Sequence, residues 1–244
     1  MIRGRRYIRN WRSIMKNKQL FCFTYAGGNA SFFDEIEQEL TEYDVIKIEY
    51  SGHGLRRKEP YYKNFTELAD DMYSLIKSSY AGGKYALFGY SMGSISLVEV
   101  LSRILETDDF PNPEHAFLAA HEPHTKVELA SFSNDEIDEY VKQRTINFGA
   151  VPEVLLKNET YWRIYLPIYR ADYSLISQYS FNNMRFNTTI PATVFFSETD
   201  TPTKDMLQWR DFFTGECDYY SFEGNHFFIQ EHYFDVAEII RKKF

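Results

Sequence analysis

One stretch of the sequence, ALFGYSMGSISLVEV at residues 86–100, restricts the fold more than any other. Its first residues are continuously apolar, as in a β-strand buried on both faces, and its last residues repeat apolar side chains at helical spacing. Between them, Gly89 and Gly93 flank Ser91 in a G-x-S-x-G pattern. Such a sharp turn strains the serine backbone and leaves no room for flanking side chains. The stretch therefore predicts a buried strand, a tight turn that exposes the Ser91 hydroxyl, and a helix.

Short apolar runs alternate with helical patterns along most of the chain. The predicted strands are Leu20–Tyr25, Val45–Tyr50, Tyr85–Gly89, Ala116–Ala120, Thr193–Phe196 and Tyr219–Phe222. The predicted helices are Phe32–Leu40, Phe65–Ser79, Ser91–Leu105, Lys204–Phe213 and Tyr233–Lys243. This alternation predicts an α/β fold, with a mostly parallel central sheet and helices on both faces. Because we find no repeats and no break in composition, we expect one domain over residues 20–244.

One region interrupts this alternation. From about Lys126 to Tyr179 no convincing strand occurs, and SNDEIDEYVKQR begins with a Ser-Asn-Asp signal typical of a helix N-terminus. A connection between two sheet strands rarely needs so many residues. We therefore interpret residues 126–179 as a helical insertion that forms a lid over a site, with an ordinary crossover as the alternative.

Charge is distributed unevenly. The net charge is −8, yet residues 1–18 hold seven basic side chains and no acidic one. We interpret residues 1–19 as a basic, poorly ordered N-terminal extension, because chain termini are often poorly ordered. The alternative is an arm that binds a membrane or nucleic acid. The acidic remainder argues against nucleic acid as a partner.

No apolar run approaches the roughly 20 residues that span a membrane. Two cysteines make no disulfide framework, so we expect a cytoplasmic protein without membrane attachment.

Aromatic residues are abundant, at 18% of the chain. Aromatic side chains mostly fill protein cores, and a phenylalanine-rich core is therefore the simpler interpretation. The alternative is a large apolar cleft lined by tyrosines.

Ser91 needs a base if it acts as a nucleophile. In folds built around G-x-S-x-G, the partners follow in the order Ser, then Asp or Glu, then His. His226, in EGNHFFI after the last predicted strand, satisfies this order and is the predicted base. The remaining histidines are interpreted as loop or structural residues: His53, His115, His121, His124 and His232.

The acid should follow the strand that precedes this histidine. Asp200 lies in SETD at the carboxyl end of the predicted strand 193–196, where it could accept a hydrogen bond from the imidazole and fix its tautomer. Glu198 and Asp205 are the alternatives. Asp205 could equally be an acidic residue at a helix N-terminus.

An oxyanion hole in such folds uses the backbone N–H after the nucleophile and one from the loop after an early strand. The first donor is Met92. The loop FTYAGGNASFF supplies the second, for which we predict Ala26, with Gly27 as the alternative.

Several motifs together resemble one known family. LFCFTYAGGNASFF, ALFGYSMGS, LPIYRADY, SETDTP followed by Trp, and EGNHFFI occur in the order found in the type II thioesterases of nonribosomal peptide and polyketide synthesis. The resemblance covers the chain from Leu20 to about Ile240. It implies an α/β-hydrolase fold with a mobile helical lid. It also implies Ser91, Asp200 and His226 as the catalytic triad, and Ala26 and Met92 as the oxyanion donors.

The resemblance further implies a reaction and a partner. Enzymes of this family hydrolyse unwanted acyl or aminoacyl groups from the phosphopantetheine arm of acyl or peptidyl carrier proteins. The chain itself then needs no metal and no bound cofactor, and we expect a monomer. The alternatives are a carboxylesterase or lipase acting on free esters, a catalytically inactive binding protein of the same fold, and a cyclising thioesterase domain cut from a synthase.

The chain departs from the family pattern in three places. Thr24-Tyr25 replaces Pro-His before the A-G-G loop, and Tyr90 replaces a histidine before the nucleophile. Ser51-Gly52-His53 replaces a Pro-Gly-Arg turn. None of these departures removes a triad residue, so they bear on substrate preference and rate.

Overall fold

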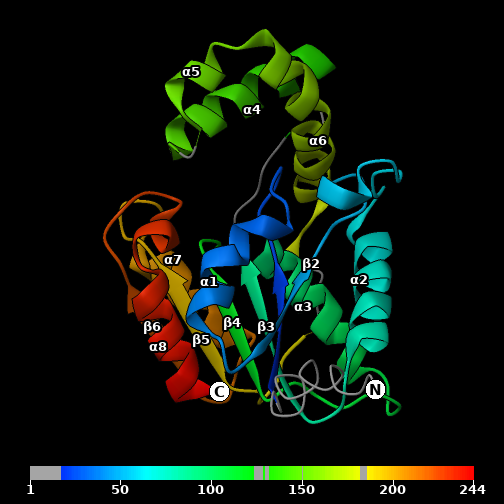
Figure 1. Ribbon diagram of the computed structural model, residues 1–244, viewed down its shortest axis with the longest axis vertical. Coiled ribbons are helices and arrows are strands. Elements are labelled where there is room, and N and C mark those ends of the chain that lie inside the picture. Colours follow the sequence, from blue (N-terminus) through cyan, green and yellow to red (C-terminus); the bar gives the residue numbers. More distant parts are fainter. Residues whose placement is uncertain (1–17, 124–128, 130–131, 150, 182–185) are drawn as a thin grey trace, which may run out of the picture.

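A six-stranded parallel sheet in the order β2-β1-β3-β4-β5-β6 forms the centre of the protein. The computed structural model describes residues 18–244 except 124–128, 130–131, 150 and 182–185 (Figure 1). The strands are β1 (Lys18–Phe23), β2 (Asp44–Ile48), β3 (Lys84–Tyr90), β4 (His115–Ala119), β5 (Ala192–Phe196) and β6 (Cys217–Ser221). All neighbouring pairs are parallel. The predicted α/β fold is thus confirmed, with each strand boundary within two residues of its prediction.

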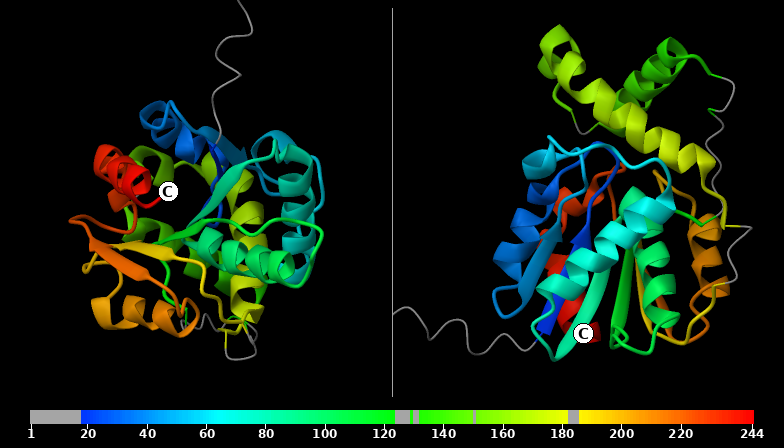
Figure 2. Two further views of the ribbon diagram at one scale, coloured as in Figure 1. Left: turned by 90° about the horizontal axis from the view of Figure 1, so that it is seen from below. Right: turned by 90° about the vertical axis from the view of Figure 1, so that its right-hand side faces the viewer.

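Helices cover both faces of the sheet, as expected (Figures 1 and 2). On one face α1 (Asp34–Glu39) packs against α8 (Tyr233–Lys243), and these helices share one apolar cluster with β1 and β3. On the other face α2 (Phe65–Ser79) packs against α3 (Met92–Leu105) over a second cluster. Continuously apolar strands are therefore buried from both sides, as parallel strands must be.

Two predicted helices are divided in the structure. The region predicted as Phe32–Leu40 contains a 3₁₀ turn at Ala30–Phe33 followed by α1. The region predicted as Lys204–Phe213 contains α7 (Thr203–Met206) followed by a 3₁₀ turn at Leu207–Asp211. Apolar spacing alone does not separate the two helix types, because short 3₁₀ segments present nearly the same side chains to a core.

Phenylalanine dominates the core. Among the described residues, the twelve largest side chains that are almost fully buried include eight phenylalanines and three tyrosines. The high aromatic content is therefore used largely for packing, as the simpler interpretation had it.

The segment between β4 and β5 is mainly helical in its described part. It contains α4 (Asn134–Phe148), α5 (Glu153–Leu156) and α6 (Glu159–Gln178), which lie together above the carboxyl ends of the strands (Figures 1 and 2). A capping box between Ser133 and Glu136 starts α4, where the sequence signal had placed a helix N-terminus. We call α4, α5 and α6 the lid.

Some expectations concern residues that the structure does not describe. The basic segment 1–17, Lys126 at the predicted start of the insertion, and His124 lie outside the described residues. β1 begins at Lys18, two residues before its predicted start and inside the range expected for the extension. Within the described residues, no helix has the length and apolar composition required to cross a membrane.

Candidate active site

Ser91 lies in a strained turn between β3 and α3. Its φ of 55° and ψ of −119° belong to a region that residues other than glycine rarely adopt. Gly89 and Gly93 flank Ser91 because no side chain fits at either position. A Cβ on Gly89 would lie 2.2 Å from the Gly93 carbonyl oxygen, and a Cβ on Gly93 would lie 2.0 Å from the Phe23 carbonyl oxygen. The turn is therefore built as the G-x-S-x-G pattern predicts.

His226 lies between Ser91 and Asp200. Its Nε2 is 3.0 Å from Ser91 Oγ, and its Nδ1 is 2.8 Å from Asp200 Oδ2. The side chains of His226 and Asp200 are only 7% and 10% exposed. An imidazole with its proton on Nδ1 donates to the carboxylate and can accept the serine proton at Nε2. The structure thus brings together the three residues predicted from the order of motifs.

The alternative acids point elsewhere. Glu198 Oε2 accepts the Thr203 N–H at 2.8 Å and so caps the first turn of α7. Asp205 Oδ1 lies 3.4 Å from Gln208 Nε2, within the segment that follows. Neither side chain hydrogen bonds to His226 among the described residues.

The other described histidines contact neither Ser91 nor Asp200 by hydrogen bond. His232 Nε2 lies 3.1 Å from the Glu223 carbonyl oxygen, and His115 Nε2 lies 2.9 Å from Thr193 Oγ1. Burial lowers the pKa of His115 and that of His121 to about 4, so both rings are neutral. These histidines have the structural character expected for them.

Of the two loop residues considered as oxyanion donors, Gly27 is already engaged. Its N–H donates to Asp172 Oδ2 at 2.6 Å. The Ala26 N–H has no hydrogen-bond partner among the described residues. Met92 is the first residue of α3, a position whose N–H has no acceptor within the helix. Ala26 and Met92 therefore remain available to hold a developing negative charge.

Tyr90 supports the loop that carries His226, which sequence reasoning did not foresee. Its buried hydroxyl donates to the His226 carbonyl oxygen at 2.7 Å. Tyr25 packs its ring edge-on against Phe227, with the ring centroids 4.9 Å apart. Two of the three departures from the family pattern thus place tyrosines around the histidine loop.

Phe148, the last residue of α4, stacks on His226. The ring centroids are 3.9 Å apart and the ring planes differ by 15°. The Arg144 guanidinium lies 4.5 Å from the centroid of the Phe148 ring. A residue of the lid therefore covers one face of the imidazole, and the position of α4 is coupled to the site.

Replacing Phe148 with alanine is expected to lower kcat/KM roughly 3- to 10-fold, because an aromatic contact of this kind contributes about 0.5–1.5 kcal/mol. Steady-state hydrolysis of an acyl thioester measures the change. Ile146→Ala is the matched control, since Ile146 lies on the same helix and is 47% exposed. Equal rates for the two variants would show that the stack does not support the reaction.

A cavity of about 200 Å³ lies between Ser91, His226 and the lid. Five tyrosines line it: Tyr25, Tyr161, Tyr165, Tyr169 and Tyr173. Four of the five come from α6. A tyrosine-lined cavity thus exists beside the phenylalanine-rich core, but it is smaller and more polar than the large apolar cleft considered as the alternative. Among the described residues, no group of three or more His, Cys, Asp or Glu side chains is placed to bind a metal ion.

Sequence comparisons find known proteins that are similar to this chain. The rat medium-chain S-acyl fatty acid synthase thioesterase is 26% identical over 218 residues, which are 87% of this chain and 82% of that protein. The gramicidin S biosynthesis protein GrsT of Aneurinibacillus migulanus is 27% identical over 92% of this chain and 88% of its own length.

Among solved structures, ClbQ from the colibactin nonribosomal peptide and polyketide pathway superposes with a TM-score of 0.82. It is 26% identical, and the match covers 93% of this chain and 96% of that one. The sequence model of the thioesterase domain family matches residues 18–244. The resemblance identified from the motifs is thereby confirmed: this chain belongs to the thioesterase domain family.

Proposed function

We propose that this protein is a type II thioesterase. In this role it hydrolyses misprimed or stalled acyl and aminoacyl groups from the phosphopantetheine arm of carrier proteins in nonribosomal peptide or polyketide synthesis. The observation that carries the proposal is the hydrogen-bonded series Ser91–His226–Asp200 at the floor of a lidded cavity. The names of GrsT and ClbQ support the pathway class.

Ser91 acts as the nucleophile in this proposal. As Ser91 Oγ attacks the thioester carbonyl carbon, His226 Nε2 takes the hydroxyl proton. The carbonyl oxygen becomes an oxyanion that the N–H groups of Ala26 and Met92 stabilise, each contributing roughly 3 kcal/mol. When the C–S bond breaks, His226 returns the proton to the departing thiol, and the acyl group remains on Ser91.

Water completes the cycle. His226 Nε2 removes a proton from a water molecule that attacks the acyl-serine ester, and the same proton then returns to Ser91 Oγ as the free acid leaves. Asp200 accepts a hydrogen bond from His226 Nδ1–H without taking the proton, which holds the ring in the required tautomer and stabilises the imidazolium.

The thiol leaving group belongs to the partner. The phosphopantetheine arm arrives covalently attached to an acyl or peptidyl carrier protein, so the proposal requires no cofactor bound to this chain. The acyl group would occupy the cavity beneath α6. Its tyrosine-rich wall combines ring surface with hydroxyl groups, which suits short or polar acyl groups better than long saturated chains.

Comparing three substrates with the same acyl group tests this proposal: an acyl-carrier protein, the acyl-pantetheine thioester, and a nitrophenyl ester. We expect kcat/KM to be largest for the carrier-bound thioester, because the protein partner adds binding energy. Release of the free acid is measured by chromatography. Hydrolysis of the nitrophenyl ester without hydrolysis of the carrier-bound thioester would instead identify an esterase.

A further inference from the structure

A buried carboxylate connects the lid to the loop that carries Ala26. Asp172 lies on α6, and its side chain is only 4% exposed. Its Oδ2 accepts the Gly27 N–H at 2.6 Å and lies 2.9 Å from Nε2 of His53, whose side chain is 2% exposed. Burying a carboxylate is costly unless it is paired and hydrogen bonded. Three segments distant in sequence therefore meet at one oxygen atom.

Both ring nitrogens of His53 face acceptors. Nε2 faces the Asp172 carboxylate, and Nδ1 lies 3.0 Å from the Ser51 carbonyl oxygen. A carbonyl oxygen and an ionised carboxylate can only accept hydrogen bonds. A neutral imidazole carries one proton and would present a lone pair to one of these oxygens. The geometry therefore favours the imidazolium, with a proton on each nitrogen.

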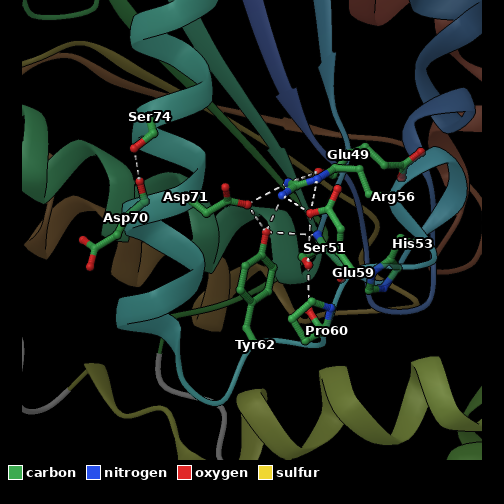
Figure 3. A network of polar contacts seen from close by, with 10 residues as sticks. All are labelled: Glu49, Ser51, His53, Arg56, Glu59, Pro60, Tyr62, Asp70, Asp71 and Ser74. Atoms are coloured by element: carbon green, nitrogen blue, oxygen red, sulfur yellow. Dashed lines mark hydrogen bonds and ion pairs between the residues drawn. The ribbon is translucent and has the colours of Figure 1, made fainter.

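The Ser51 carbonyl group is itself held in place by a polar network (Figure 3). The Ser51 N–H donates to the Tyr62 hydroxyl at 3.0 Å, and that hydroxyl donates to Asp71 on α2. Arg56 Nη1 donates to the same Asp71 oxygen at 2.7 Å. Ser51, the residue whose carbonyl oxygen faces His53, is thus anchored through its own N–H to α2.

On its other side, Asp172 fixes a turn. Residues 25–28 form a β-turn closed by a hydrogen bond of 3.0 Å from the Gly28 N–H to the Tyr25 carbonyl oxygen. Gly27 has a φ of +78°, as type II turns require at their third residue. The peptide between Ala26 and Gly27 is the one whose rotation distinguishes type I from type II turns, and its N–H donates to Asp172. Losing that acceptor would allow this peptide to rotate.

From these contacts we infer that His53 and Asp172 form a buried ion pair that positions the Ala26 N–H for oxyanion binding. The inference rests on the proposed function, in which Ala26 is a donor. The Tyr25 carbonyl group and the Ala26 N–H belong to the same peptide, so the turn that Asp172 stabilises also sets the direction of the donor. His53 and Asp172 are positioning residues, since neither side chain contacts the reacting atoms.

The ion pair is expected to depend on pH. Burial lowers the pKa of His53, but the nearby Asp172 charge, the hydrogen bonds of the ring and Glu49 outweigh burial and raise it above the ordinary 6.5. Tyr50 and Tyr61 also face the ring, with centroids 5.7 and 6.4 Å away. Because the pKa is raised, the ion pair is complete at lower pH and is lost as pH rises through that pKa.

Nuclear magnetic resonance of the full chain labelled with ¹⁵N-histidine tests the ion pair without any activity. At pH 6, below the ordinary pKa of 6.5, we expect both nitrogens of His53 to be protonated, with the resonance assigned by its loss in His53→Gln. Asp172→Asn should lower the pKa of His53. A neutral His53 at pH 6 in the wild-type protein would overturn the inference, whether or not the protein hydrolyses thioesters.

Kinetics test the positioning role. Asp172→Asn is expected to lower kcat roughly 10- to 100-fold with little change in KM, because an oxyanion donor acts mainly in the transition state. Asp138→Asn is the matched control, since Asp138 pairs with Arg170 within the lid. Wild-type kcat should also fall at alkaline pH, whereas His53→Gln should lack this limb. Equal kcat values for the two asparagine variants would overturn the positioning role.

Discussion

Replacing Ser91 with alanine is expected to reduce the release of acid from an acyl-carrier thioester by roughly 10⁴-fold or more. The alanine variant keeps the oxyanion donors and the cavity, but it has no atom that can form the acyl-enzyme bond. In the unchanged protein, His226 Nε2 lies 3.0 Å from Ser91 Oγ. Without that hydroxyl, His226 can deprotonate only water. Single-turnover hydrolysis with excess enzyme measures the residual rate.

Ser102→Ala is the control for this substitution, because Ser102 lies on the helix that follows Ser91 and its Oγ donates to Glu106 Oε1 on the exposed surface, at 3.3 Å. Its rate should equal that of the wild type. Mass spectrometry of the protein mixed with substrate supplies a second readout: the acyl adduct should appear on the wild type and be absent from Ser91→Ala. An adduct that persists in the alanine variant would place the acyl group on another residue.

The sheet could be predicted from sequence largely because β1, β3, β4 and β5 are buried on both faces. Continuous apolar runs such as those of β3 and β4 have few alternative interpretations when helical patterns separate them. The site followed from the same reasoning. Parallel strands end at one edge, so residues just after β3, β5 and β6 are brought together there. Ser91, Asp200 and His226 occupy those three positions.

Contacts between the lid and the core could not be predicted in this way. His53 and Asp172 are 119 residues apart, and no pattern in the sequence pairs a loop histidine with a helical aspartate. The stack of Phe148 on His226 likewise depends on where α4 lies above the sheet. Periodicity reports which face of a helix is apolar, but it does not report the partner that the face meets.

The lid explains why the sequence interpretation of His53 was incomplete. A histidine in a glycine-flanked loop is ordinarily a loop or structural residue, and His53 is indeed satisfied by hydrogen bonds. The local sequence does not show that a carboxylate lies beside the His53 ring. Asp172 comes from the RADY motif of the insertion, so the two motifs that looked separate form one buried pair.

Substitution of Gly93 by alanine is expected to cause the largest loss of stability among the substitutions considered, at least about 3 kcal/mol. The added Cβ would lie 2.0 Å from the Phe23 carbonyl oxygen and 2.9 Å from the Thr24 carbonyl oxygen. Both are backbone atoms at the end of β1, which pairs with β2 and β3 on its two sides. They cannot rotate away as a side chain could, so α3 must move off the sheet.

Thermal unfolding measures this loss of stability. The same substitution at a second glycine, Gly82, separates the effect of steric overlap from that of backbone strain. Gly82→Ala places a Cβ where no atom lies within 4 Å, but its φ of +87° is strained for alanine, which costs about 1–2 kcal/mol. Gly93 has no such strain, so its loss reports the steric overlap, reduced by the roughly 0.5–1 kcal/mol by which a helix favours alanine over glycine. At roughly 2–4 °C per kcal/mol, Gly93→Ala should lower the Tm by more than 6 °C and Gly82→Ala by less. Equal shifts would mean that α3 can retreat from β1 at little cost, and Ser91 would then not be held rigidly by the helix that follows it.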